Sequence, residues 1–176
     1  MHDRNSERTL GCVTFERGRL LSGRGILMRS TIPSDIIRLI DDSYRRWMGH
    51  PLETPASVGQ YRLRWLHAEA GFGLMAHSAE ADPCFIYANR SAQRVFGYSM
   101  SELLRLPSRL SASREDRADR DAFLRALKEC GIVHGFSGMR VAKGGTRFRI
   151  HDASVWELHD THGRRWGQAA LYRFED

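Results

Sequence analysis

The C-terminal part of the chain constrains the fold most, because it contains three strand-like runs separated by two tight turns. The runs cover residues 132–141, 147–158 and 165–174. The turns are Lys143-Gly144-Gly145 and Asp160-Thr161-His162-Gly163. Glycine and aspartate in such short connections favour hairpins. The pattern therefore predicts three antiparallel strands in a meander.

Two shorter strands and three helices are expected before this meander. The strands lie at 71–77 and 84–88, the helices at 89–96, 99–106 and 114–130. Asn89 is placed to cap the first helix, and Ser99 with Glu102 resembles a capping box at the second. This order predicts an α+β fold with one five-stranded antiparallel sheet and helices on one face.

The N-terminal part divides into an extension and a helical region. Glycines interrupt residues 1–32, which show neither helical nor strand periodicity, so we expect a flexible or non-native extension. Two helices, at 33–48 and 57–70, are expected within the segment 33–70. The main domain then covers 71–176.

The first N-terminal helix carries a wide apolar stripe that includes Ile40 and Trp47. This is a large apolar surface for a peripheral helix. Such a stripe more often packs in the core of its own domain, which is one alternative here. Because of its size we expect the stripe to pack at a homodimer interface, or to bridge the domain and a partner protein.

The basic charge of the chain is too dispersed to predict a nucleic-acid-binding face. The net charge is +6 and the pI is about 9.7. Residues 1–32 contain six arginines against three acidic residues, so half of the excess charge lies in the extension. Binding to a phosphate backbone normally requires a clustered basic face. Direct nucleic-acid binding is therefore not expected.

Cysteine usage and hydropathy favour a cytoplasmic protein. Cys12, Cys84 and Cys130 are odd in number and far apart, which argues against a disulfide framework and against a thiolate zinc site. No apolar run approaches the roughly 20 residues of a membrane span. The N-terminus also lacks the apolar stretch of a signal peptide.

Several sequence motifs occur in an order that points to one family. DPxFxYxN and LPSRLSA lie within residues 76–112, and SGxR, RFRI, VW and GQAA follow within 136–170. Over about residues 34–174 the chain resembles the MEKHLA domain family. These are PAS-related domains found as small bacterial proteins and at the C-terminus of plant class III homeodomain–leucine zipper regulators. The resemblance implies a PAS-like fold and a sensory or regulatory role.

A PAS-like fold implies a pocket between the inner face of the sheet and the small helices, with mostly apolar walls and a few polar groups. The candidate ligand-binding residues are His77, Asn89, Ser108, Arg109, Arg140, Trp156 and Gln168. Trp156 can also serve simply as part of the core. No catalytic residue is assigned, and no metal site is expected because the eight histidines are scattered.

Three of these residues have both a ligand-binding and a structural interpretation. Arg109 can clamp an anion through its planar guanidinium, or it can tie its own loop in place. His77 can contact a ligand or hold the hairpin turn. Gln168 can offer a donor and an acceptor to a ligand or to neighbouring backbone. We expect the three to converge on one cavity, with Asp82 or Asp152 as the protein partner of Arg109 if no ligand supplies one.

The identity of the ligand stays open at this point. A photoactive flavin would need a reactive cysteine, and residues 100–109 contain none. A haem would usually need a histidine on the long helix, and residues 114–130 contain none. Neither haem nor flavin is therefore expected.

The expected function is that of a sensory or regulatory protein, which binds a small molecule or a protein partner to control a signalling or transcriptional response. Nucleotide-binding and hydrolase motifs such as GxGxxG, GxxxxGK[ST] and GxSxG are absent from the sequence. Two alternatives remain. One is a small enzyme with His77 as base and Arg109 as anion clamp, and the other is a ligand-free dimerisation module.

Overall fold

The computed structural model describes residues 15–16, 19–20, 33–112 and 117–175. Two very short strands, β1 (Phe15–Glu16) and β2 (Arg19–Leu20), pair as an antiparallel hairpin. The sequence analysis predicted no strand there. Most of the expected flexible extension lies outside the described residues.

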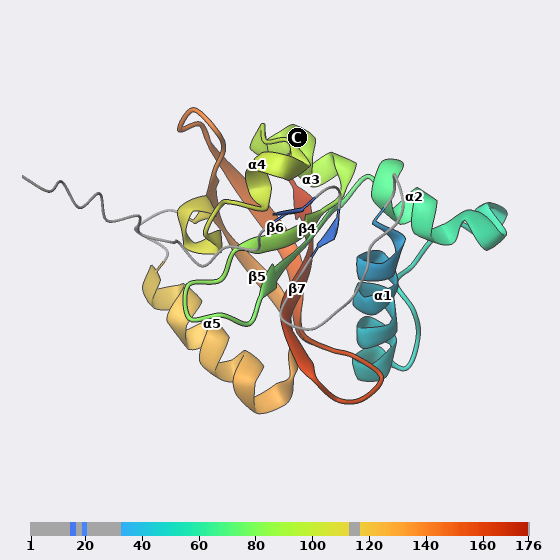
Figure 1. Cartoon of the computed structure of the whole chain (residues 1–176). Helices are drawn as coiled ribbons and strands as arrows, with labels where there is room; N and C mark the ends of the chain where they lie inside the picture. Colours follow the sequence, from blue (N-terminus) through green and yellow to red (C-terminus); the bar gives the residue numbers. More distant parts are fainter. Residues whose placement is uncertain (1–14, 17–18, 21–32, 113–116, 176) are drawn as a thin grey trace, which may run out of the picture.

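The main domain is built on one antiparallel sheet with the strand order β4-β3-β7-β6-β5 (Figure 1). Its strands are β3 (Gly73–Ser78), β4 (Phe85–Ala88), β5 (Ile132–Val141), β6 (Arg147–His159) and β7 (Arg165–Phe174). The predicted five-stranded antiparallel sheet is confirmed. Its first strand, β3, pairs with its last strand, β7, which places two distant segments at the sheet centre.

One face of the sheet, the inner face, is covered by the helices that follow β4. These are α3 (Arg90–Phe96), α4 (Met100–Leu103), the 3-10 helix η2 (Ser108–Ser111) and α5 (Arg117–Cys130). The Ser99–Glu102 capping box predicted for α4 is present. The buried residues of this layer include Met75, Phe85, Ala92, Phe96, Leu103, Ile150 and Tyr172.

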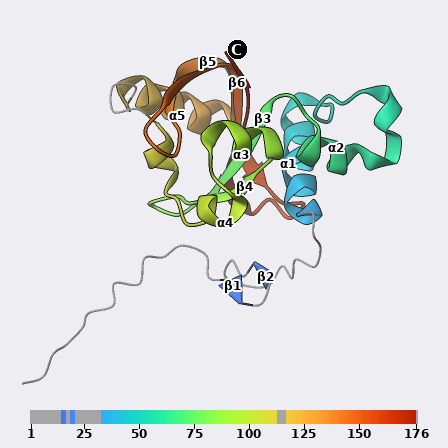
Figure 2. The same ribbon diagram turned by 90° about the horizontal axis from the view of Figure 1, so that it is seen from above.

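The opposite, outer face is covered by the N-terminal helices α1 (Ser34–Met48) and α2 (Arg62–Ala68), as Figures 1 and 2 show. Side chains alternate along β3, so Leu74 and Ala76 face α1 and α2 while Met75 belongs to the inner layer. The outer core includes Ile36, Ile37, Ile40, Leu66, Trp156, Leu158 and Ala169.

The position of α1 corrects the expectation for its apolar stripe. Ile37 and Ile40 are fully buried against the sheet of the same chain. Ser43 and Trp47 add polar anchors, since their side chains each donate a hydrogen bond of 2.9 Å to the backbone oxygen of Glu157. The stripe therefore covers its own domain and is not a free dimer surface.

The second N-terminal helix is shorter than predicted. Ala56–Tyr61 form a 3-10 turn, and the α-helix begins only at Arg62. Gly59 breaks the helix because its φ of 45° lies in the left-handed region. Arg62 then pairs with a largely buried carboxylate, that of Asp41 on α1, with its Nε 3.0 Å from Oδ2.

Two further expectations can be compared with the structure. Cys84 is disulfide-bonded, so the argument against disulfides from cysteine spacing is wrong at this residue, whereas Cys130 is free and exposed. Among the described residues, no helix is long and apolar enough to cross a bilayer.

The burial of α1 leads to a stability prediction. Replacing Ile37, which is 0% exposed, with alanine should lower the free energy of unfolding by about 2–5 kcal/mol, because it leaves a cavity in the outer core. The sedimentation coefficient should not change. Urea unfolding and analytical ultracentrifugation measure the two effects, with exposed Arg38→Ala on the same helix as the control. A shift toward a smaller species with little loss of stability would instead support an interface role for the stripe.

Candidate functional site

A cavity of about 110 Å³ lies between the inner face of the sheet and the helices. Its apolar walls include Met75, Phe85, Phe96, Phe136, Ile150 and Ala153. Ser108, Arg140, His77, Gln168 and Tyr172 supply the polar lining considered below. We call this space the inner cavity.

Two hydroxyl groups that line the inner cavity have no hydrogen-bond partner among the described residues. They belong to Ser108, which is 5% exposed, and Tyr172, which is 3% exposed. A buried hydroxyl without a partner costs about 1–3 kcal/mol relative to its hydrated state. The two groups are therefore free to bond a molecule that enters the cavity.

Tyr172 occupies its place because Gly73 leaves room for its ring. A Cβ atom at Gly73 would lie 2.3 Å from a carbon of that ring. Burial raises the pKa of the Tyr172 hydroxyl well above its usual range, and the nearby Arg140 charge offsets only part of this rise. The hydroxyl therefore stays protonated and can donate as well as accept a hydrogen bond.

Ser108 is held rigidly at the rim of the β3–β4 hairpin. Its backbone N–H donates to the Pro83 oxygen at 2.7 Å, and Ser111 Oγ donates to the Ser108 oxygen at 2.7 Å. The LPSRLSA segment thus lies beside the sheet, and its residues Ser108 and Ser111 line the inner cavity. Because its backbone is fixed, the Ser108 side chain is presented to the cavity without further ordering.

Arg140 also lines the inner cavity, from β5. Its guanidinium lies over the Phe136 ring, 5.3 Å from the centroid, and its Nη1 donates to the Met139 backbone oxygen at 2.9 Å. These contacts hold the cation at the side of the cavity, where it adds positive potential near Tyr172.

His77 and Gln168 are direct neighbours in the β3–β7 register and form one wall of the inner cavity. His77 Nδ1 donates to the Ser78 backbone oxygen at 2.9 Å. Gln168 Nε2 donates to Glu157 Oε1 at 2.8 Å. The same two residues also line a second, larger hollow.

Arg109 lies in that second hollow together with His77 and Gln168, but it does not line the inner cavity. Its side chain is 55% exposed and forms a bidentate ion pair with Asp82, with Nε 3.0 Å from Oδ1 and Nη2 3.1 Å from Oδ2. Asp82 is thus the carboxylate partner, while Asp152 lies near Arg173. An anion clamp by Arg109 inside the inner cavity is ruled out by this position.

Asn89 and Trp156 do not line the inner cavity, and both are buried in the packing of the domain. The Asn89 side chain is fully buried, accepts from the backbone N–H groups of Leu74 and Ala92, and donates to two carbonyls. All its hydrogen-bonding groups are therefore used by the protein. Trp156 faces the outer core, where its ring packs edge-on against Tyr44 at 4.9 Å.

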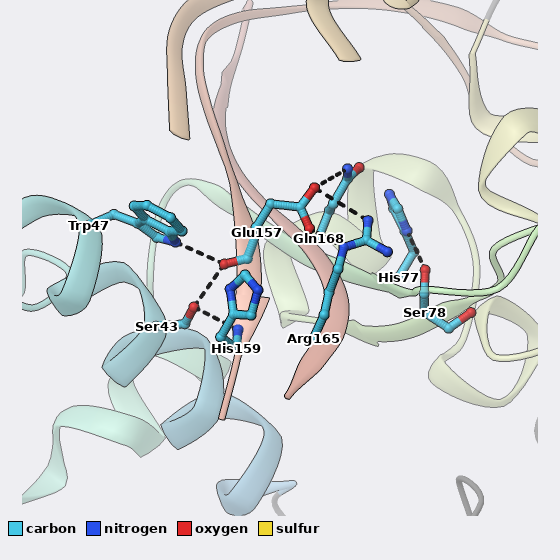
Figure 3. A network of polar contacts seen from close by, with 8 residues as sticks. All are labelled: Ser43, Trp47, His77, Ser78, Glu157, His159, Arg165 and Gln168. Atoms are coloured by element: carbon cyan, nitrogen blue, oxygen red, sulfur yellow. Dashed lines mark hydrogen bonds and ion pairs between the residues drawn. The ribbon is translucent and has the colours of Figure 1, made fainter. Parts of the chain in front are cut away.

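Sequence reasoning missed Tyr172 and Glu157. Alternation along the last strand places Tyr172 on the same face as Gln168, so this signal was available. Glu157 gives no such signal, because its role depends on contacts with two other elements, β7 and α1. Its carboxylate binds Gln168 and Arg165, and its backbone oxygen accepts from α1 (Figure 3).

Figure 3 shows how this residue connects the cavity wall to the N-terminal helix. Gln168 bonds the Glu157 carboxylate on the inner side. Ser43 and Trp47 bond the Glu157 backbone oxygen on the outer side, and Ser43 also accepts from the His159 N–H at 3.1 Å. We call this chain of contacts the Glu157 relay.

An antiparallel sheet in this strand order, with helices over a small apolar cavity, defines the class of PAS-like domains. A PAS domain from a protein of Colwellia psychrerythraea has the same fold, with a TM-score of 0.57 and 14% identity, covering 66% of this chain and 95% of that one. A light-oxygen-voltage domain gives 0.54 and 17% identity, covering 69% and 89%. The PAS domain of a two-component sensor histidine kinase gives 0.53 and 17%, covering 69% and 100%.

The family model of the MEKHLA domain matches residues 34–175, and the chain belongs to this family. The match includes both N-terminal helices, which the structure packs on the outer face of the sheet. No curated protein matches the chain in sequence. Within the described residues there is also no group of side chains suited to hold a metal ion.

The contrast between structural and unpartnered polar groups can be tested by unfolding in urea. Asn89→Ala should lower the free energy of unfolding by more than about 2 kcal/mol, because it leaves several buried backbone groups without partners. Tyr172→Phe should change it by less than about 1 kcal/mol or raise it, because the hydroxyl it removes makes no bond. A large loss for Tyr172→Phe would show that the hydroxyl is already satisfied.

Proposed function

We propose that this MEKHLA domain is a sensory module that binds a compact, mainly apolar molecule with one polar group in the inner cavity. The observation that carries this proposal is the pair of unpartnered hydroxyls, Ser108 Oγ and Tyr172 OH, in an otherwise apolar space. A ligand that bonds either hydroxyl would remove the desolvation cost of that group while filling the cavity.

The size of the cavity narrows the class of ligand. Drug-sized ligands occupy pockets of about 300–1,000 Å³. A dry cavity of about 150 Å³ accommodates one benzene ring. The inner cavity, at about 110 Å³, therefore favours a molecule near the size of a single small ring. Flavin and haem are much larger and would require the helices to move apart.

The Glu157 relay provides a route from the cavity to the surface. A ligand that displaces Gln168 would disturb its bond to the Glu157 carboxylate. The backbone oxygen of Glu157 holds Ser43 and Trp47, so such a shift would reach α1. A regulatory protein that contacts the exposed side of α1 could then respond to occupancy of the cavity.

Binding of phenol, with toluene as a probe of similar shape, tests the proposed site. Phenol should bind saturably and at least about tenfold more tightly than toluene, since its hydroxyl can bond one of the two buried hydroxyls. Tyr172→Phe or Ser108→Ala, whichever removes the hydroxyl that phenol bonds, should remove most of this difference. Isothermal titration calorimetry measures both affinities.

Tyr61→Phe serves as the matched control, because Tyr61 is 62% exposed and lies outside the inner cavity. It should bind phenol as the unmodified protein does. Equal affinity for phenol and toluene, or no saturable binding of either, would overturn the proposal.

Hydrogen exchange of α1 tests the relay. Phenol binding should change the exchange rates of α1 amides in the unmodified protein. Gln168→Met keeps the side-chain size but removes the bond to Glu157, so phenol should still bind while the effect on α1 is lost. Exposed Gln60→Met is the control. An unchanged response of α1 in Gln168→Met would contradict the relay.

A further inference from the structure

The second hollow, which shares His77 and Gln168 with the inner cavity, has a different chemistry from that cavity. It is a cleft of about 590 Å³ formed by the β3–β4 hairpin, the C-terminal half of α5 and the start of β7. Four cationic side chains line it: Arg109, Arg125, Lys128 and Arg165. We call it the basic cleft.

The carboxylates of the basic cleft neutralise only part of this charge. Glu80 and Asp82 are its two acidic residues. Asp82 is paired with Arg109, and Glu80 accepts a hydrogen bond from Ser78 Oγ at 3.2 Å. Asp82 balances Arg109, and Glu157 next to the cleft balances Arg165, so Arg125 and Lys128 stand against Glu80 alone. The remaining excess of one positive charge raises the concentration of anions in a concave site.

Arg125 and Lys128 supply the cations that are available to a ligand. They lie three positions apart on α5 and so share one face of the helix. Both side chains are exposed, and neither forms an ion pair among the described residues. Their ammonium and guanidinium groups can therefore bond an oxyanion without breaking an existing contact.

The shape of the basic cleft favours a small ligand over a nucleic acid. Its volume falls within the range of about 300–1,000 Å³ typical of small-molecule sites. A nucleic acid needs an extended basic surface that follows its backbone. Glu80 and Asp82 at the hairpin would interrupt such a surface and repel consecutive phosphates.

We propose that the basic cleft is a second binding site, which takes a small oxyanion such as a phosphate or an organic dicarboxylate. Arg125 and Lys128 bond the anion, and Arg165 faces it from β7. Arg165 also pairs with Glu157, so an anion in the cleft competes with Glu157 for this guanidinium. Occupancy of the cleft therefore changes the contacts of Glu157 through Arg165, whereas a ligand in the inner cavity changes them through Gln168.

Nuclear magnetic resonance titration of the full chain tests this site with inorganic phosphate and with malonate. Sodium chloride keeps the ionic strength constant, because exposed charges are screened by salt. At least one of the two anions should shift the amide signals of residues 78–82 and 125–128 saturably, with a Kd near or below about 1 mM. The anion that binds more tightly identifies which oxyanion chemistry the site prefers.

Two matched double variants distinguish specific anion binding in the basic cleft from a general attraction of anions to positive charge on the protein. Arg125→Gln with Lys128→Gln should weaken binding at least about tenfold. Arg45→Gln with Arg46→Gln removes the same charge from α1 on the other face and should leave binding unchanged. Circular dichroism confirms that both variants fold.

The proposal is overturned if neither anion gives saturable shifts, or if the two double variants weaken binding equally. Its failure is distinct from failure of the proposed function, because phenol binding depends on Ser108 and Tyr172 and on neither double variant. If phenol does not bind but the anion does, the proposed function of the inner cavity is overturned and the basic-cleft proposal stands.

Discussion

The pairing of β3 with β7 is the contact on which the rest of the structure depends. It joins the first and last strands of the sheet at its centre and sets which side chains face inward. The register requires very close backbone approach at one point, where a Cβ atom on Gly167 would lie 1.9 Å from the His77 oxygen. Only glycine fits there, and its φ of 148° is also one that other residues rarely adopt.

This register creates the two hollows together. His77 stands opposite Gln168, and the pair separates an apolar cavity from a cleft with excess positive charge. Two hollows with opposite chemistry thus share one wall. Glu157 lies next to that wall and binds residues that face each side, so a change in either hollow reaches the same carboxylate.

The inner cavity shows a balance between stability and binding. Most buried polar groups around it are fully used, as in Asn89, which joins α2, β3 and α3 through four hydrogen bonds. Ser108 and Tyr172 differ, because their hydroxyls are buried without partners. A protein selected for stability alone would replace such groups with apolar ones. Their presence in a cavity fits a site that is completed by a ligand.

The outer face of the sheet is closed by α1, and this limits how the domain can communicate. The apolar stripe of α1 is buried in the outer core, while Ser43 and Trp47 donate hydrogen bonds to the backbone of β6. The remaining exposed side of α1 carries charged residues such as Arg38 and Arg45. A partner would therefore meet a polar helix surface whose position depends on β6.

The sequence by itself determined the elements and their order. Strand alternation, hairpin turns and the Ser99–Glu102 capping box are local signals, because each depends on residues that are neighbours along the chain. They predicted the five strands and the helices of the inner face, and the family motifs added the expected fold. The break at Gly59 was missed, since a glycine within an apolar pattern is also tolerated in a helix.

The tertiary structure decided which polar side chains have hydrogen-bond partners within the protein and which of them line a cavity. Seven residues were candidates from the sequence, and the fold placed Asn89 and Trp156 in structural roles and Arg109 outside the inner cavity. Whether a hydroxyl or a cation has a partner depends on atoms brought together from distant segments. Local patterns carry no information on such contacts, so the unpartnered hydroxyl of Tyr172 and the central position of Glu157 emerged only from the folded chain.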